Sequence, residues 1–206
     1  MVGSSLLVDN FAGGGGLRTD VAALYVDPRG PYPTLVRDWY DETRDAKTYA
    51  GPWPVVAHPP CGPWGMMRGL CTKQDKSAGP HAVEMVRRYG GVLEHPQNSR
   101  LFDHCGMPRP GEMVDGAGGW TVYLEQVAWG HCCTKPTWLY AVGVDPVRVD
   151  GGMRYGGTAT HRVTSGPRGP VLPSASSLRR RLTPPAFAEW LVELAESARL
   201  AGGRAA

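Results

Sequence analysis

The sequence lacks a long apolar run, a leader segment and a disulfide framework. No stretch approaches the roughly 18 uninterrupted apolar residues of a membrane span, and no basic segment leads into an apolar run near the N-terminus. The five cysteines are an odd number without disulfide-framework spacing, and Cys132 and Cys133 are adjacent and unsuited to bonding each other. A reducing compartment suits such a chain best. We therefore predict a cytoplasmic protein without a membrane partner.

The sequence also has little net charge and lacks internal repeats. The formal charge is only +3 over 206 residues, and no internal repeat is present. Hydrophobic residues make up 42% of the chain and charged residues 20%, which is typical of a globular protein and not of a disordered one. The length suits one domain with a core of its own. The 28 glycines and 19 prolines predict many turns between short elements.

Positive charge is concentrated in one part of the chain. Three arginines are consecutive, Arg179, Arg180 and Arg181, and Arg162 is one of several that precede them. Acidic residues are sparse between Asp150 and Glu189. A basic surface of this kind suits a phosphate backbone, so we predict that these four arginines contact nucleic acid. An ordinary solvated surface is the alternative.

Strand-like and helix-like segments alternate, which predicts an α/β fold built on a single doubly wound, mostly parallel sheet. The predicted strands are 5–9, 22–27, 54–57, 91–96 and 137–143, and the predicted helices are 34–45, 77–88 and one beginning at 183–185. We divide the chain into a core (1–143), a short Gly/Pro/Arg-rich recognition segment (144–178), a returning C-terminal helix (179–200) and a tail (201–206).

Three unusual turns follow predicted strands, where ligands of such sheets bind. The first is the glycine run Gly13–Gly16, which would let the backbone approach a ligand closely. Asp27 ends the next predicted strand and is suited to bind ribose hydroxyls. A flexible loop is the alternative for the glycine run.

The second turn is His58-Pro59-Pro60-Cys61. Two prolines restrict the backbone and hold the following side chain in one direction. A thiol presented in this way is a candidate nucleophile. The alternative is a buried structural cysteine in a tight turn.

The third turn holds Glu94, which follows three apolar residues at the end of a predicted strand. Partial burial there would raise the pKa of its carboxyl group and suit it to proton transfer. The alternative is a surface acid.

A fourth cluster, His131-Cys132-Cys133, raises the question of a metal, with His104 and Cys105 as further candidate ligands. The spacing fits none of the usual paired-cysteine zinc patterns, so the sequence does not favour a metal site.

In order along the chain, these clusters resemble the DNA cytosine-5 methyltransferase family. The run 9–15 (DNFAGGG) resembles its cofactor motif, Asp27 its ribose-binding acid, and Pro59-Pro60-Cys61 its nucleophile turn. Glu94 resembles the acid that holds the cytosine ring, and 123–143 and 181–183 resemble its later motifs.

The resemblance implies a reduced Rossmann-like methyltransferase fold and S-adenosylmethionine as cofactor. It assigns catalysis to Cys61, Glu94 and Lys135, and cofactor binding to Phe11, Gly13, Gly15, Asp27 and Pro59. The recognition segment is shorter than the family's, which predicts little sequence specificity. The substrate is then DNA, single-stranded DNA or a free cytosine nucleotide, and a partner protein is an open alternative.

A second resemblance is to small phage-type proteins of unassigned function, through 25–33 (YVDPRGPYP), 90–96 (GGVLEHP) and 183–187 (TPPAF). It predicts a bacterium or a phage-infected cell as the setting. Two alternatives therefore stand beside methylation. One is a nucleotide-modifying enzyme that uses Cys61 and Glu94 without S-adenosylmethionine. The other is a non-catalytic DNA-binding protein on a decayed methyltransferase frame.

Overall fold

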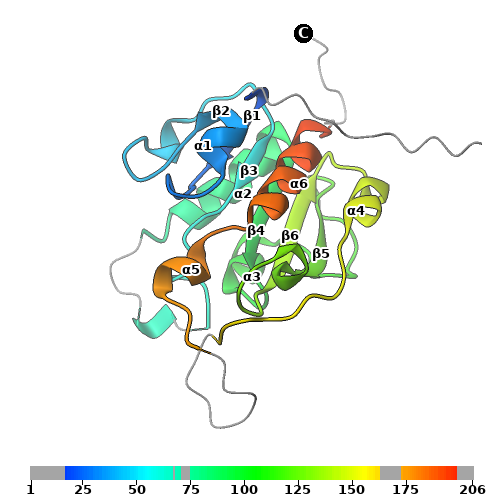
Figure 1. Cartoon of the computed structure of the whole chain (residues 1–206). Helices are drawn as coiled ribbons and strands as arrows, with labels where there is room; N and C mark the ends of the chain where they lie inside the picture. The colour runs from blue at the N-terminus through cyan, green and yellow to red at the C-terminus, as the bar shows by residue number, and fades with distance from the viewer. Residues whose placement is uncertain (1–16, 67, 71–74, 163–172, 199–206) are drawn as a thin grey trace, which may run out of the picture.

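A computed structural model describes residues 17–66, 68–70, 75–162 and 173–198. The predicted first strand, the glycine run with Phe11, Gly13 and Gly15, and the predicted tail lie outside these residues. The described chain forms one sheet with helices packed against it (Figure 1). The prediction of an α/β fold is therefore confirmed.

The sheet has six strands in the order β2-β1-β3-β4-β6-β5. β1 pairs in parallel with β2 and β3, and β3 pairs in parallel with β4. β6 runs antiparallel to both of its neighbours, β4 and β5, so the sheet is mixed. The strands are β1 (Arg18–Leu24), β2 (Val36–Trp39), β3 (Val55–Ala57), β4 (Gly91–Pro96), β5 (Trp120–Glu125) and β6 (Pro136–Val142).

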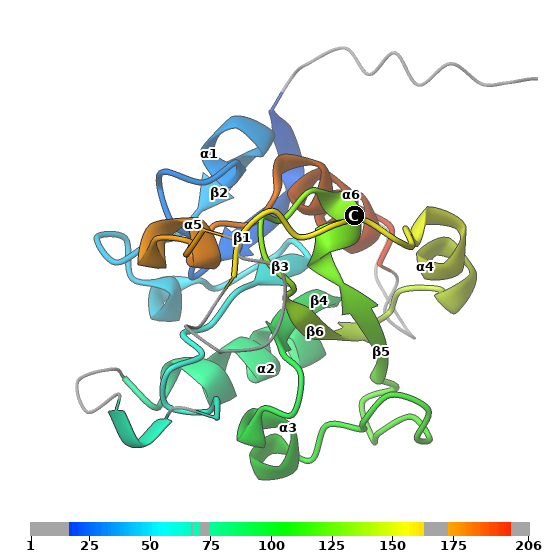
Figure 2. The same ribbon diagram turned by 60° about the horizontal axis from the view of Figure 1, so that its bottom comes forward.

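Helices cover both faces of this sheet (Figures 1 and 2). The α-helices are α1 (Tyr32–Leu35), α2 (Ala78–Tyr89), α3 (Arg100–Cys105), α4 (Pro146–Gly152), α5 (Ser177–Arg181) and α6 (Pro185–Glu196). Three 3-10 helices connect other elements: η1 (Ala46–Thr48), η2 (Arg68–Leu70) and η3 (Gln126–Trp129).

The protein has two hydrophobic cores, one on each face of the sheet, because successive side chains of a strand point to opposite faces. In β1, Val21 and Ala23 face the core that includes α6, whereas Ala22 and Leu24 face the core that includes α2 and α3. All four residues are fully buried. The central strands thus bury both faces, which explains why they read as continuous apolar runs rather than as alternating ones.

The predicted helix 34–45 is wrong beyond its first residues. Helix α1 ends at Leu35, and the chain continues directly into β2. Val36, which is β-branched, pairs with Arg18, and Trp39 pairs with Ala23 of β1. Residues of these types fit a pleated surface, and strand pairing has overridden the helical pattern.

Part of the predicted recognition segment belongs to the core. Asp145 caps α4 by accepting a hydrogen bond from the backbone of Val147, and Val149 of that helix is fully buried against the α6 side of the sheet. The predicted helix that begins at 183–185 is confirmed as α6, and a separate short helix, α5, precedes it within the segment 144–181.

The order of the strands places a crevice between β1 and β3. The chain leaves β1 for β2 on one side and later enters β3 on the other. Connections that diverge in this way open a space beyond the carboxyl ends of the two strands, where α/β proteins bind ligands. Residues 25–31 follow β1 there, and His58–Cys61 follow β3.

A glycine holds the next strand close to β3. Gly91 has a φ of +110°, and a Cβ atom at this position would lie 2.1 Å from the carbonyl oxygen of Val55. No larger residue permits this approach of β4 to β3. The pairing matters for the site, because it sets the register that brings Glu94 beside His58.

Candidate functional site

Glu94, in β4, lies beside His58, the residue directly after β3. Ala57 of β3 pairs with Leu93 of the parallel strand β4, so the next residue on each side is His58 and Glu94. The Nδ1 atom of His58 is 3.1 Å from Oε2 of Glu94. Glu94 is 6% exposed, so its carboxylate depends on protein partners rather than on water.

The other oxygen of Glu94 is held from the antiparallel side of the sheet. Its Oε1 accepts hydrogen bonds from Nε2 of Gln126, in η3, and from Oγ1 of Thr137, in β6, at 3.2 Å. The Nζ atom of Lys135 lies 3.8 Å from the same oxygen. Gln126 and Thr137 are fully buried, and the carboxylate therefore has a dry, hydrogen-bonded setting.

The pKa of Glu94 is lowered, and the predicted rise is wrong. Burial raises the pKa of the carboxyl group, but Lys135 and the hydrogen bond and charge of His58 lower it further. These interactions together outweigh desolvation, and Glu94 is a carboxylate at neutral pH. The sequence prediction considered burial and overlooked the partners that accompany it.

A buried tyrosine extends this contact. The hydroxyl oxygen of Tyr32 is 2.5 Å from Nε2 of His58, so both imidazole nitrogens have partners. Tyr32 is 2% exposed, and its burial raises the pKa of the phenol well above 10. Tyr32, His58 and Glu94 therefore form a hydrogen-bonded series of side chains that extends from α1 to β4. Sequence reasoning missed Tyr32, Gln126 and Thr137, because nothing in their local pattern distinguishes them from core residues.

Cys61 is exposed and begins a tight turn beyond β3. Its carbonyl oxygen accepts hydrogen bonds from the backbone of Trp64 and of Gly65, at 3.1 and 2.7 Å. The carbonyl of Trp64 accepts from the backbone of Arg100 at the start of α3, which anchors the turn. Pro59 is buried at its base. Cys61 is three positions after His58, so their Cα atoms are within roughly 11 Å.

A cavity of about 470 Å³ lies at the same end of the sheet. The residues that line it come from the turn after β1, the turn after η3 and the connection into α6: Arg29, Gly30, Pro31, Thr34, Gly130, His131, Cys132, Arg179, Leu182, Thr183, Pro184 and Pro185. Its size is in the range of small-molecule sites.

Asp27, the predicted ribose-binding acid, is engaged by a neighbour. Arg29 donates to both of its oxygens, from Nε at 2.9 Å and from Nη2 at 2.7 Å. This hydrogen bonding lowers the pKa of Asp27. Arg29 also lines the cavity, so Asp27 orients a cavity residue.

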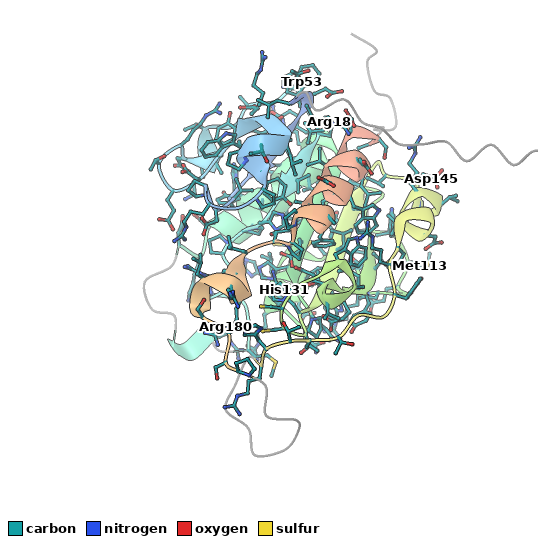
Figure 3. All side chains as sticks on the ribbon, viewed as in Figure 1. Arg18, Trp53, Met113, His131, Asp145 and Arg180 are labelled. Carbon is teal, nitrogen blue, oxygen red and sulfur yellow. The ribbon has the colours of Figure 1, made fainter. Side chains whose placement is uncertain are left out.

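The four predicted nucleic-acid arginines occupy different positions. Arg179 lines the cavity, and its Nη1 is 3.0 Å from Nε2 of His161. Arg162 bonds to Ser174 over 3.4 Å, and Arg181 lowers the pKa of Asp27. Figure 3 shows Arg180 close to His131 at this end of the molecule. Of the four predicted arginines, Arg179 is the one that lines the cavity.

No protein-family model, curated protein or solved structure matches the chain. Within the described residues, no helix has the length and apolarity needed to cross a membrane.

Proposed function

We propose that this protein transfers a methyl group from S-adenosylmethionine to carbon 5 of cytosine in DNA, through a covalent adduct with Cys61. The observation that carries the proposal is the contact of Glu94 with Lys135 and with His58, which begins the turn that contains Cys61. Lys135 lies 3.8 Å from Glu94, Glu94 contacts His58, and Cys61 follows His58 by three residues. The Rossmann-like methyltransferase fold is part of the same proposal.

Covalent catalysis explains why these groups are needed together. Carbon 5 of cytosine attacks a methyl sulfonium too slowly without help. Addition of the Cys61 thiolate at carbon 6 makes carbon 5 an enamine-like nucleophile. Carbon 5 then takes the methyl group, S-adenosylhomocysteine leaves, and loss of the carbon 5 proton to a base releases the thiolate.

The lowered pKa of Glu94 decides how the ring is held. An ionised carboxylate only accepts hydrogen bonds, so Glu94 accepts from the exocyclic amine of cytosine. The ammonium group of Lys135, beside it, supplies positive charge as electron density builds on ring nitrogen 3. This division of roles replaces the prediction that Glu94 itself gives the proton.

The cavity beside the turn after β1 is the proposed cofactor site. Its volume suits a ligand of this size, and Arg29 and Arg179 line it and suit a carboxylate. A base in duplex DNA would have to be flipped out to reach Cys61. Arg162, Arg180 and Arg181 are proposed phosphate contacts beside the site.

The test is transfer of a labelled methyl group from S-adenosylmethionine to cytosine-containing DNA, with Cys61→Ala and the control Cys105→Ala. Cys105 is a half-buried cysteine of α3, outside the site. The proposal expects label in 5-methylcytosine with the wild type and the control, and none with Cys61→Ala. Equal labelling by Cys61→Ala, or no labelling and no cofactor binding by calorimetry, contradicts it.

A second candidate is a cytosine or nucleotide-modifying enzyme that works without S-adenosylmethionine. It is favoured by the completeness of the Tyr32–His58–Glu94 chain and by Asp27, whose two oxygens already bind Arg29. Calorimetry with S-adenosylmethionine separates the two candidates, because only the first requires binding.

A further inference from the structure

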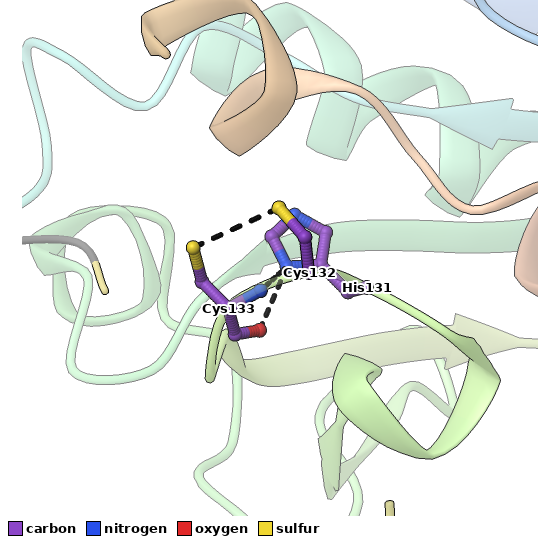
Figure 4. A group of neighbouring side chains, drawn as sticks. All are labelled: His131, Cys132 and Cys133. Carbon is purple, nitrogen blue, oxygen red and sulfur yellow. Dashed lines mark hydrogen bonds between the residues drawn. The ribbon is translucent and has the colours of Figure 1, made fainter. Parts of the chain in front are cut away.

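The turn between η3 and β6 brings two thiols and an imidazole together. One ligand atom from each of His131, Cys132 and Cys133 lies within 4.8 Å of the others (Figure 4). His131 is 5% exposed, Cys133 is fully buried and Cys132 is half-buried. The usual zinc-finger spacings do not cover adjacent cysteines, which is why the sequence pattern did not favour this cluster.

We infer that His131, Cys132 and Cys133 form a binding site for a soft, thiolate-preferring cation, of which Zn²⁺ is the representative, with a fourth position open to the cavity. The inference does not depend on the proposed methyl transfer. His131 and Cys132 both line the cavity, so a water or a donor group of a bound ligand would complete the coordination.

The spacing of the sulfur atoms fits such a site. Cys132 Sγ and Cys133 Sγ are 3.8 Å apart. Two thiolates at about 2.3 Å from one tetrahedral zinc ion are separated by about 3.8 Å. The two sulfur atoms are therefore already spaced as two corners of a zinc tetrahedron, and a ligand atom of His131 lies within 4.8 Å of both.

The backbone of Cys133 holds the imidazole of His131 at Nδ1, which lies 2.7 Å from the carbonyl oxygen and 3.1 Å from the backbone nitrogen of that residue. In the tautomer in which Nδ1 donates to the carbonyl, the Nε2 lone pair is available to a metal, and a backbone carbonyl is a common partner of zinc-bound histidine.

The surrounding charges are compatible with a cation. Two thiolates and one divalent ion are together neutral, so the nearby arginines do not oppose occupancy. Candidate fourth ligands nearby are already engaged: His161 bonds through Nδ1 to Thr160 and through Nε2 to Arg179. The open position therefore faces the cavity.

The experiment measures metal binding by the full-length chain, without DNA. Chelator-treated protein is titrated with Zn²⁺ against a chromophoric chelator and, separately, with Co²⁺, whose thiolate-to-cobalt absorption reports sulfur ligation. We expect one ion per chain, and weakening by more than about 100-fold in Cys132→Ser and Cys133→Ser, because even an outer partner of a ligand contributes about 10–100-fold. The control Cys105→Ser keeps wild-type affinity.

Folding of each variant is checked by circular dichroism, and Cys132→Ser is the decisive one because its side chain is the less buried of the two. Three results overturn the inference. They are no bound zinc and no thiolate-to-cobalt absorption in the wild type, equal loss in Cys105→Ser, or a Cys132–Cys133 disulfide, seen as a mass lower by two hydrogen atoms, in protein kept reduced.

Discussion

The imidazole Nδ1 of His58 lies 3.1 Å from Oε2 of Glu94, on the adjacent parallel strand. Tyr32 contacts the other imidazole nitrogen, so the ring of His58 is held at both of its nitrogens. It connects the turn that presents Cys61 with the buried carboxylate. Stability and chemistry at this edge of the sheet should therefore respond to the same substitutions.

Glu94→Gln should destabilise the protein by about 3 kcal/mol at pH 7. The substitution keeps the shape of the side chain but leaves the charges beside it without their carboxylate, and breaking a buried pair costs about 3–5 kcal/mol. Urea unfolding gives the free-energy difference. Glu84→Gln, on the exposed side of α2, is the control and should stay within about 0.5 kcal/mol of the wild type. Equal stability of Glu94→Gln and wild type would refute the role of this charge.

The same pair of proteins gives a pH dependence. The pKa of Glu94 is lower in the folded state than its ordinary value of 4.5, so the carboxylate stabilises the fold above that pH. This contribution is lost as the pH falls below about 4.5 toward the folded-state pKa. The difference in unfolding free energy between wild type and Glu94→Gln should therefore shrink between about pH 6 and pH 3. A difference that grows toward acid pH would mean a raised pKa.

Tyr32→Phe should cost about 1 kcal/mol, which is typical of one buried hydrogen bond. The ring keeps its packing, and only the hydroxyl contact with His58 is lost. Tyr123→Phe is the control, because Tyr123 is 45% exposed. Thermal and urea unfolding of both variants make the measurement. A Tyr32→Phe protein no less stable than Tyr123→Phe would show that the hydroxyl does not support His58.

Gly91→Ala should be among the most damaging substitutions in the sheet. Its Cβ would lie 2.1 Å from the Val55 carbonyl, and a φ of +110° is strained for alanine, so we expect a loss above about 3 kcal/mol. Gly116→Ala meets nothing within 4 Å and is the control. Urea midpoints of the two variants give the comparison, and similar midpoints would contradict the close approach of β4 to β3.

The fold class was predictable from the sequence, and so was the position of several strands. Residues 91–96 were predicted as a strand and form β4. A short apolar run between a glycine pair and a proline is typical of a buried strand. The segment 34–45 was not predictable in the same way. Whether Val36–Trp39 joins a helix or a strand depends on β1, which lies beside it only in the folded chain.

Some residues of the site were also predictable from the sequence, and others were not. Glu94 and Cys61 were identified because each was predicted to end or follow a strand near proline, although Glu94 lies inside β4. The partners of Glu94 come from η3 and β6, and no local pattern connects Gln126 or Thr137 with a residue more than 30 or 40 positions away. The direction of the Glu94 pKa depends on those partners, so a prediction from burial alone had the wrong sign.

The central claim, a Cys61 adduct formed during methyl transfer, is tested most directly by trapping. DNA containing 5-fluorocytosine carries fluorine where the reaction must remove a proton, so an adduct that has received the methyl group cannot eliminate the thiolate. The account predicts a covalent protein–DNA complex that resists denaturation, requires S-adenosylmethionine, forms with Cys105→Ala and is absent with Cys61→Ala. A complex that forms equally with Cys61→Ala, or none with a wild type shown to bind both cofactor and DNA, would contradict it.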